Sequence, residues 1–434
     1  MNMYDIILKK RDDNALTKEE IDYFISGYTI GDIPDYQASA LLMAIYFNKL
    51  SKEETYYLTD AMRRSGDTAD LSGINGIKVD KHSTGGVGDK TTLVVAPIAA
   101  SCGVPIAKMS GRGLGFTGGT VDKMESIPGF RTSLEADEFI GMVNNVGMSV
   151  IGQTAHIAPA DKKLYALRDV TATIDNIGLI TSSIMSKKLA SGSDAIVLDV
   201  KCGSGAFMED IEDAAELGQW MVDIGKAAGK NTVALITDMS QPLGKAVGNS
   251  LEIIEAIETL KGNGPEDITE LALTLASYMI YIGSIAGSPE QGRELAIEHL
   301  NSGAALKKLG QFIEGQGGDP RVLIDYSILP AAKFKMEITA ERAGYVSAID
   351  ARMIGMASQH SGAGRMKKED AIDLAAGILL ERKVGDEVMQ NSLLATIYSN
   401  DEEKLKDAAH MASAAFTFSD APVEKPLLVK RIIK

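Results

Sequence analysis

Two glycine-rich segments hold the residues best suited to chemistry in this sequence. The first reads KHSTGGVGDKTT over residues 81–92, and the second reads KMSGRGLGFTGGT over residues 108–120. Glycines let backbone amides approach an anion closely, hydroxyl groups donate hydrogen bonds to it, and the leading lysines, Lys81 and Lys108, supply positive charge. Two such loops could hold one phosphate from two sides. An ordinary turn between a strand and a helix is the competing interpretation.

The same segments contain incomplete matches to nucleotide-binding motifs. Residues 113–118 have the form G-x-G-x-x-G, but Pro128 follows soon after, where a helix is required. Residues 86–91 resemble a P-loop in which Asp89 stands in place of the last glycine. The first match leaves open a dinucleotide-dependent oxidoreductase that would use Gly113, Gly115 and Gly118.

A third segment combines hydroxyl groups with basic side chains. It reads DKKLYALRDV over residues 161–170 and ITSSIMSKK over residues 180–188. If the second part is helical, Ser183 and Lys187 stand at positions i and i+4 and project from one face. That face could meet a polar ring with a hydroxyl group and a cation. Taken alone, the pattern equally describes a solvated helix face.

Helices are predicted near the N-terminus. The segments that begin at Thr17 and Ser51 both have the S/T-x-x-E form of a capping box, in which two side chains satisfy unpaired helix amides. Between them, residues 36–47 carry apolar side chains at helical spacing. Residues 1–70 therefore form the predicted helical domain.

The remaining chain predicts two further domains. From Gly76, short Val and Ile runs at residues 77–80, 195–200 and 233–237 alternate with glycine turns and amphipathic stretches, as in an α/β domain with a largely parallel sheet. Beyond Pro330, residues 344–348 and 384–388 are β-like and flank an expected helix over residues 368–380. The predicted fold class is thus α/β, with a mixed, largely parallel sheet.

Composition restricts the partners and the compartment. The 44 basic and 59 acidic residues give a net charge of −15, which argues against nucleic acid or an anionic membrane as a partner. Cys102 and Cys202 are too few for a disulfide framework, so a reducing cytoplasm is expected. The start of the chain lacks the order of a signal peptide, and no uncharged stretch reads as a membrane span.

Together, residues 81–89, 108–115, 166–171 and 182–188 resemble the thymidine and pyrimidine-nucleoside phosphorylases, and the similarity runs through nearly the whole chain. The resemblance implies that residues 160–192 complete the helical domain and that residues 71–159 and 193–330 form the phosphate-binding α/β domain. Residues 331–434 would form an α+β subdomain like a barrel-sandwich, without a carrier lysine. A homodimer formed through the helical domain is also implied.

The resemblance assigns roles residue by residue. The catalytic residues would be His82, Arg168 and Lys187. His82 would lie beside the base and the glycosidic bond, where it can hydrogen-bond or protonate the leaving pyrimidine. The pyrimidine would be bound by Arg168, Ser183 and Lys187. The phosphate would be bound by Lys81, His82, Ser83, Thr92, Lys108, Met109, Ser110 and Thr120.

The resemblance also implies a monovalent cation, K⁺, and no organic cofactor. The ion would be held mainly by backbone oxygens of Gly88, Lys90, Leu243, Ala246 and Glu255. Lys90 departs from the family pattern, which has a smaller neutral residue there, so its ammonium is expected to point away from the ion. Phe116 stands where histidine is expected.

The expected reaction is the reversible phosphorolysis of uridine, thymidine and deoxyuridine to the free base and ribose or deoxyribose 1-phosphate. A deoxy-specific thymidine phosphorylase is the nearest alternative, and a non-catalytic nucleoside or phosphate binder is a more remote one. An anthranilate-type phosphoribosyl transferase is disfavoured because acidic magnesium ligands are not evident near the loops.

Overall fold

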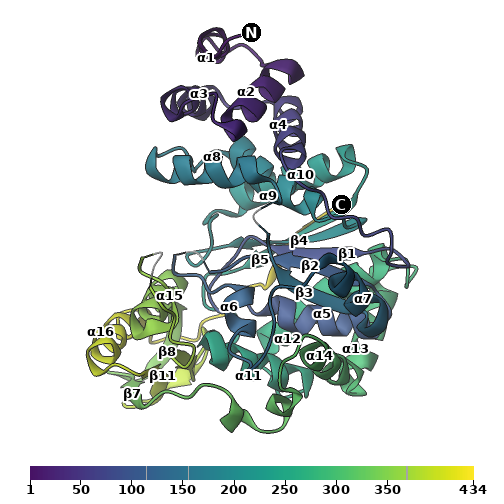
Figure 1. Cartoon of the computed structure of the whole chain (residues 1–434). Coiled ribbons are helices and arrows are strands. Elements are labelled where there is room, and N and C mark those ends of the chain that lie inside the picture. Colours follow the sequence, from purple (N-terminus) through teal and green to yellow (C-terminus); the bar gives the residue numbers. More distant parts are fainter. Residues whose placement is uncertain (114, 155, 368–369) are drawn as a thin grey trace.

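The computed structural model describes residues 1–113, 115–154, 156–367 and 370–434. In Figure 1 a helical domain lies above a central α/β domain, and a smaller β-rich domain lies beside the central one. This arrangement confirms the predicted fold class, including the mixed and largely parallel character of the central sheet.

The helical domain joins N-terminal helices to a distant helical pair. Its helices are α1 (Met3–Arg11), α2 (Lys18–Ile30), α3 (Asp35–Asn48), α4 (Lys52–Arg64), α8 (Pro159–Val170) and α9 (Ile177–Ala190). Both predicted capping boxes are present, at the starts of α2 and α4. Phe24, Leu41 and Leu58 from the first group pack with Leu164 and Leu179 from the second, so an apolar core holds the two segments together.

The central sheet has the strand order β1-β4-β5-β13. Strands β1 (Val79–Ser83), β4 (Ala195–Cys202) and β5 (Asn231–Asp238) run parallel, whereas β13 (Val429–Ile433) is antiparallel to β5. A parallel pair, β2 (Ile106–Ser110) and β3 (Met148–Gly152), lies beside β1. The helices of this domain are α5 (Thr91–Ser101), α6 (Thr120–Met124), α7 (Ala136–Val146), α10 (Ile211–Ala227), α11 (Asn249–Leu260), α12 (Glu266–Ile282), α13 (Pro289–Asn301) and α14 (Ala304–Gly315).

The C-terminal domain is built on antiparallel sheets with the orders β6-β9-β11-β7 and β10-β8-β12. Its elements are β6 (Ala246–Gly248), β7 (Phe334–Thr339), β8 (Gly344–Ile349), α15 (Ala351–Ser358), β9 (Gly377–Leu380), β10 (Glu387–Val388), β11 (Leu393–Ser399), α16 (Glu402–Ser413) and β12 (Phe416–Ser419). The helix expected over residues 368–380 is wrong for the part that the structure describes. Residues 370–376 form a loop that feeds β9, because Gly377, at φ +154°, starts a strand against β6 and β11.

Two strands cross the predicted boundary between these domains. β6 precedes residue 330 but pairs with β9 of the C-terminal domain, and β13 follows it but pairs with β5 of the central sheet. The two domains therefore exchange strands. No helix within the described ranges is both long and apolar enough to cross a membrane.

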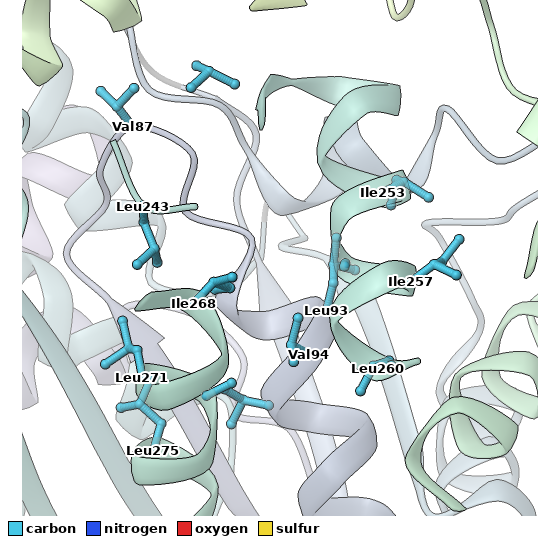
Figure 2. Packing of buried hydrophobic residues seen from close by; sticks show 14 of the residues in the cluster. Val87, Leu93, Val94, Leu243, Ile253, Ile257, Leu260, Ile268, Leu271 and Leu275 are labelled. Carbon is cyan, nitrogen blue, oxygen red and sulfur yellow. The ribbon is translucent and has the colours of Figure 1, made fainter. Parts of the chain in front are cut away.

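Apolar packing fixes α5 against its neighbours. Figure 2 shows Leu93 and Val94 of α5 between α11, which carries Ile257, and α12, which carries Leu271, all buried in the central core. The apolar, fully buried character of α5 explains why its N-terminus can be held rigidly at the end of the first glycine loop.

Candidate active site

A cavity of about 580 Å³ lies between the helical and central domains. Both glycine loops line it from the central domain. Tyr165 of α8 and Lys187 of α9 line it from the helical domain. Parallel strands bring their carboxyl ends to one edge of a sheet, so β1 and β2 deliver the two loops to the same place. The predicted residues that line the cavity are His82, Ser83, Thr92, Lys108, Met109, Ser110, Thr120 and Lys187.

An internal carboxylate organises the first loop. Asp89 accepts hydrogen bonds from the hydroxyl groups of Ser83 and Thr91, at the two ends of the loop. Burial is the largest influence on the pKa of Asp89 and would raise it, but Lys81 and other nearby lysines outweigh burial and hold it well below its usual value. Asp89 is therefore ionised, and its hydrogen bonds to Ser83 and Thr91 hold the two ends of the loop together.

Lys81 supports this loop from behind. Its buried ammonium contacts the hydroxyl group of Thr91 and lies 3.3 Å from Asp199 on the neighbouring strand β4. Lys81 is not among the residues that line the cavity. Its charge therefore lies behind the side chains that line the cavity.

The second loop presents a lysine that loses its proton easily. Lys108 lies 3.3 Å from Asp80 and donates to the backbone carbonyl of Lys81. Burial is the main cause that lowers its pKa to about 8, with Lys188 and Lys81 adding repulsion and Asp80 opposing them. An anion in the cavity would restore charge balance here.

His82 is neutral. It lies at the end of β1 and lines the cavity, where burial above all, and then Lys188 and Lys108, lower its pKa well below the ordinary 6.5. A neutral imidazole donates a hydrogen bond but carries no extra proton to transfer. Of the two roles predicted for His82, the structure favours hydrogen bonding over protonation of the leaving base.

Of the three residues predicted to bind the base, Lys187 lines the cavity, whereas Arg168 and Ser183 do not. Lys187 lines the cavity, pairs with Asp161 and donates to the hydroxyl group of Ser183 at 3.1 Å, as the i, i+4 spacing predicts. Arg168 is only 3% exposed and does not line the cavity. Its guanidinium donates to the backbone carbonyls of Thr173, Ile174 and Leu179. In this conformation Arg168 braces the turn between α8 and α9.

Several residues at the site were missed by the sequence analysis. Lys188 lines the cavity and pairs with the fully buried Asp80 at 2.8 Å. Arg352 of α15 lies over the Phe116 ring, 5.9 Å from its centroid, and both line the cavity. The doublet of lysines at 187–188 was a usable signal for Lys188, but nothing local in the sequence points from residue 352 to this site.

The residues expected to hold K⁺ are gathered, but a side chain lies among them. The Lys90 ammonium donates to the carbonyl oxygens of Leu243 at 2.8 Å and Ala246 at 3.0 Å and to the Glu255 carboxylate. The expectation that this ammonium points away is wrong, because these oxygens offer a cation better contacts than any solvent-facing position would. These residues do not fit a bound K⁺ while Lys90 is present, since the two cations would share one set of ligands.

The charge of Lys90 is secure despite its burial. Burial is the largest influence on its pKa and would lower it, but Glu255 and Glu252 outweigh burial and raise the pKa above its ordinary value. Within the described ranges, no group of three or more His, Cys, Asp or Glu side chains is placed to hold a metal ion.

Family models match the domains of the chain. Residues 4–66 match the helical bundle domain of a glycosyl transferase family, and residues 75–306 match the a/b domain of that family. Residues 345–419 match the pyrimidine nucleoside phosphorylase C-terminal domain. A solved structure of anthranilate phosphoribosyltransferase from Thermus thermophilus shares the fold, with a TM-score of 0.59 and 18% identity over 71% of this chain and 98% of that one.

Full-length relatives carry one name. The chain is 57% identical over 429 residues to a pyrimidine-nucleoside phosphorylase of Geobacillus stearothermophilus, with 99% of each chain covered. It is 55% identical to the corresponding protein of Staphylococcus haemolyticus, with 100% of each covered. With three domain models and relatives along its full length, the chain belongs to the pyrimidine-nucleoside phosphorylases of the glycosyl transferase family.

Proposed function

We propose that this pentosyltransferase cleaves uridine, thymidine and deoxyuridine reversibly with inorganic phosphate, giving the free base and ribose or deoxyribose 1-phosphate. One observation carries the proposal: two anion-binding loops on one domain face Lys187 on another across a single cavity. The names of the full-length relatives point to the same reaction.

The charges around the cavity suit this bond cleavage. Breaking the C1′–N1 bond builds positive charge on the sugar and negative charge on the base. Phosphate held by the glycine loops stabilises the sugar side, and Lys187 stabilises the base side. His82, being neutral, donates a hydrogen bond to the leaving base. Closure of the helical domain onto the loops would align the reactants and exclude water.

Selectivity for the base follows from donors and acceptors. Lys187 donates to the O4 carbonyl of uracil or thymine, and the Ser183 hydroxyl accepts from the N3 hydrogen. Cytosine has an amino group at position 4, so the Lys187 ammonium would face another donor and its contact with the base would be lost, at about 1–3 kcal/mol for a buried group. Cytidine is therefore expected to be a poor substrate.

Base release from uridine, thymidine and cytidine, each with and without phosphate, tests the proposal. We expect release from uridine and thymidine only with phosphate, together with formation of a pentose 1-phosphate. Equal rates without phosphate would rule out phosphorolysis. Thymidine cleavage without uridine cleavage would instead identify a deoxy-specific thymidine phosphorylase, and efficient cytidine cleavage would overturn the donor argument.

Two other activities are disfavoured by particular observations, and a third is separated by the assay. The amide of Gly113, which a dinucleotide would need, donates to Asp122 at 2.6 Å, and α6 behind that loop has only five residues. An oxidoreductase would change the absorbance of a nicotinamide cofactor. The resemblance to anthranilate phosphoribosyltransferase extends to the fold alone. A mere binder of nucleoside or phosphate would give no base release in the assay above.

A homodimer formed through the helical domain is part of the proposal. On α3, Tyr36 and Phe47 are each 73% exposed, and Met43 lies between them at the same helical face. An exposed apolar stripe of this kind marks a protein contact. We also propose a cytoplasmic location, supported by the free state of Cys102 and Cys202.

A further inference from the structure

Lys90 occupies a cage of oxygen atoms. Its side chain is enclosed, at 1% exposure, and its ammonium faces the carbonyls of Leu243 and Ala246 and the carboxylate of Glu255. Carbonyl and carboxylate oxygens are the ligands that hard cations prefer. One positive and one negative charge meet here, so the cage is electrically balanced by the chain itself.

The cage is fixed before any cation enters it. Glu255 also accepts from the backbone amides of Lys245 at 2.8 Å and Ala246 at 3.1 Å, which orient its carboxylate. Gly88, at φ +70°, packs directly on the two carbonyls, because an added Cβ would lie 2.6 Å from the oxygen of Leu243. Three segments meet here: the first glycine loop, residues 243–246 and α11.

Buried apolar residues and one further ion pair adjoin the cage. Figure 2 shows Val87 and Leu243 on the side of α12, with Leu243 beside Ile268, and all three are buried. The neighbouring ammonium of Lys383 is neutralised separately, since it pairs with Asp267 at 2.9 Å and donates to the carbonyl of Gly244 at 2.8 Å. Removing the Lys90 charge would leave the Glu255 carboxylate buried without its closest cation.

We propose that the Lys90 ammonium is a covalently attached cation that takes the place of a dissociable monovalent cation, so that the protein requires none from solution. Lys90 is a positioning residue. It stands between Asp89, which closes the first glycine loop, and Thr91, which begins α5. By tying that loop to residues 243–246 and α11, it holds the phosphate-binding hydroxyl groups in place.

The first experiment uses the unaltered protein. Its melting temperature and its KM for phosphate are measured in K⁺, Na⁺, NH₄⁺ and tetramethylammonium chloride at constant ionic strength. We expect both quantities to be the same in all four salts. Equilibrium dialysis against Rb⁺, read by mass spectrometry of the metal, should find no stoichiometric rubidium. A stabilisation specific to K⁺, or one Rb⁺ bound per chain, would overturn the proposal.

The second experiment removes the attached cation. Lys90→Ser leaves the oxygen cage with an opening of the size of an ammonium group. In tetramethylammonium chloride we expect its melting temperature to fall by roughly 5 °C or more and its KM for phosphate to rise about tenfold. Added K⁺ or NH₄⁺ should reverse most of both changes, because either ion can enter the vacated cage.

Two matched variants separate replacement of a cation from general damage. Lys90→Met fills the space without charge, so it should be destabilised and not rescued by K⁺. Lys10→Ser removes a lysine from another buried pair, with Glu54 at 3.0 Å, where the ammonium makes no hydrogen bond to a backbone carbonyl of the described residues. Its loss of stability should not respond to K⁺.

The outcomes are decisive in combination. Rescue of Lys90→Ser alone supports the proposal, whereas a folded Lys90→Ser that no cation rescues overturns it. If Lys90→Ser does not fold, the experiments on the unaltered protein decide the question. The melting and dialysis results do not depend on the proposed function, and only the KM results do. A chain without phosphorolytic activity would therefore leave the cation question testable.

Discussion

Lys187 forms an ion pair inside the protein and also lines the cavity. Its ammonium pairs with Asp161 in the first turn of α8 and donates to the Ser183 hydroxyl one turn earlier on α9. Asp161 therefore orients the ammonium of a residue that lines the cavity. Substitutions at Lys187 and at Asp161 can therefore separate the effect of the charge from the effect of the ion pair.

Lys187→Met should lower kcat/KM for uridine by about 10²- to 10³-fold while the protein stays folded, because the lost charge counts most in the transition state. Lys162→Met, on the exposed face of α8, is the control and should be neutral. Asp161→Asn removes the ion pair but keeps the ammonium, so it should lose much less activity. Equal losses in Lys187→Met and Asp161→Asn would show that the pair is structural only.

Lys108 predicts a pH dependence. With a pKa of about 8, its ammonium is charged below that pH and neutral above it. A charged Lys108 attracts phosphate, so kcat/KM for phosphate should fall as the pH rises through about 8. Lys108→Arg stays charged and should abolish this limb of a pH–rate profile. The same limb in both proteins would assign it to another group.

The residues of the site were partly predictable from the sequence. Ser83, Lys108 and Ser110 belong to short motifs whose chemistry is local, and strand ends bring such motifs together. Arg168 shows the limit, because only the folded turn between α8 and α9 reveals the carbonyls that its guanidinium contacts. Lys90 shows the same limit, because Leu243, Ala246 and Glu255, which its ammonium contacts, lie more than 150 positions away in the sequence.

Helices with capping boxes and strands with continuous Val and Ile runs were predicted correctly from the sequence. The capping boxes placed α2 and α4, and the Val and Ile runs placed β1, β4 and β5. The helix expected over residues 368–380 failed because its apolar part, Gly377–Leu380, is buried between two neighbouring strands. A short apolar run does not distinguish a buried strand from a helix.

Helix α3 predicts how two chains associate. Replacing both Tyr36 and Phe47 with Asp should convert a dimer to a monomer, because charge on the exposed apolar face opposes burial. Light scattering after size-exclusion chromatography would measure the mass. Ile324→Asp, at an 85% exposed position of the central domain, is the matched control and should leave the dimer intact. A monomeric unaltered protein would contradict the proposed dimer.

For the whole molecule, the exchange of β6 and β13 couples the central and C-terminal domains. Ile433 of β13 is 9% exposed and packs in the apolar cluster between the central sheet and α10, whereas its neighbour Ile432 is 39% exposed. The two residues therefore offer a matched pair of substitutions on one strand.

Ile433→Ala should lower the free energy of unfolding by about 2–4 kcal/mol, and Ile432→Ala by less than about 0.5 kcal/mol. Urea unfolding followed by the fluorescence of Trp220, the single tryptophan, on α10 beside β13, would measure both. Equally small effects of the two substitutions would mean that β13 adds little to the stability of the central sheet.

The position of β13 has a consequence for synthesis on the ribosome. The central sheet begins at residue 79 and is completed by residue 433 of 434. At about 5–20 residues per second, β5 waits roughly 10–40 s for its antiparallel neighbour. During that interval the edge of β5 can pair with another nascent chain. Crowded polysomes would therefore favour misassembly through this edge.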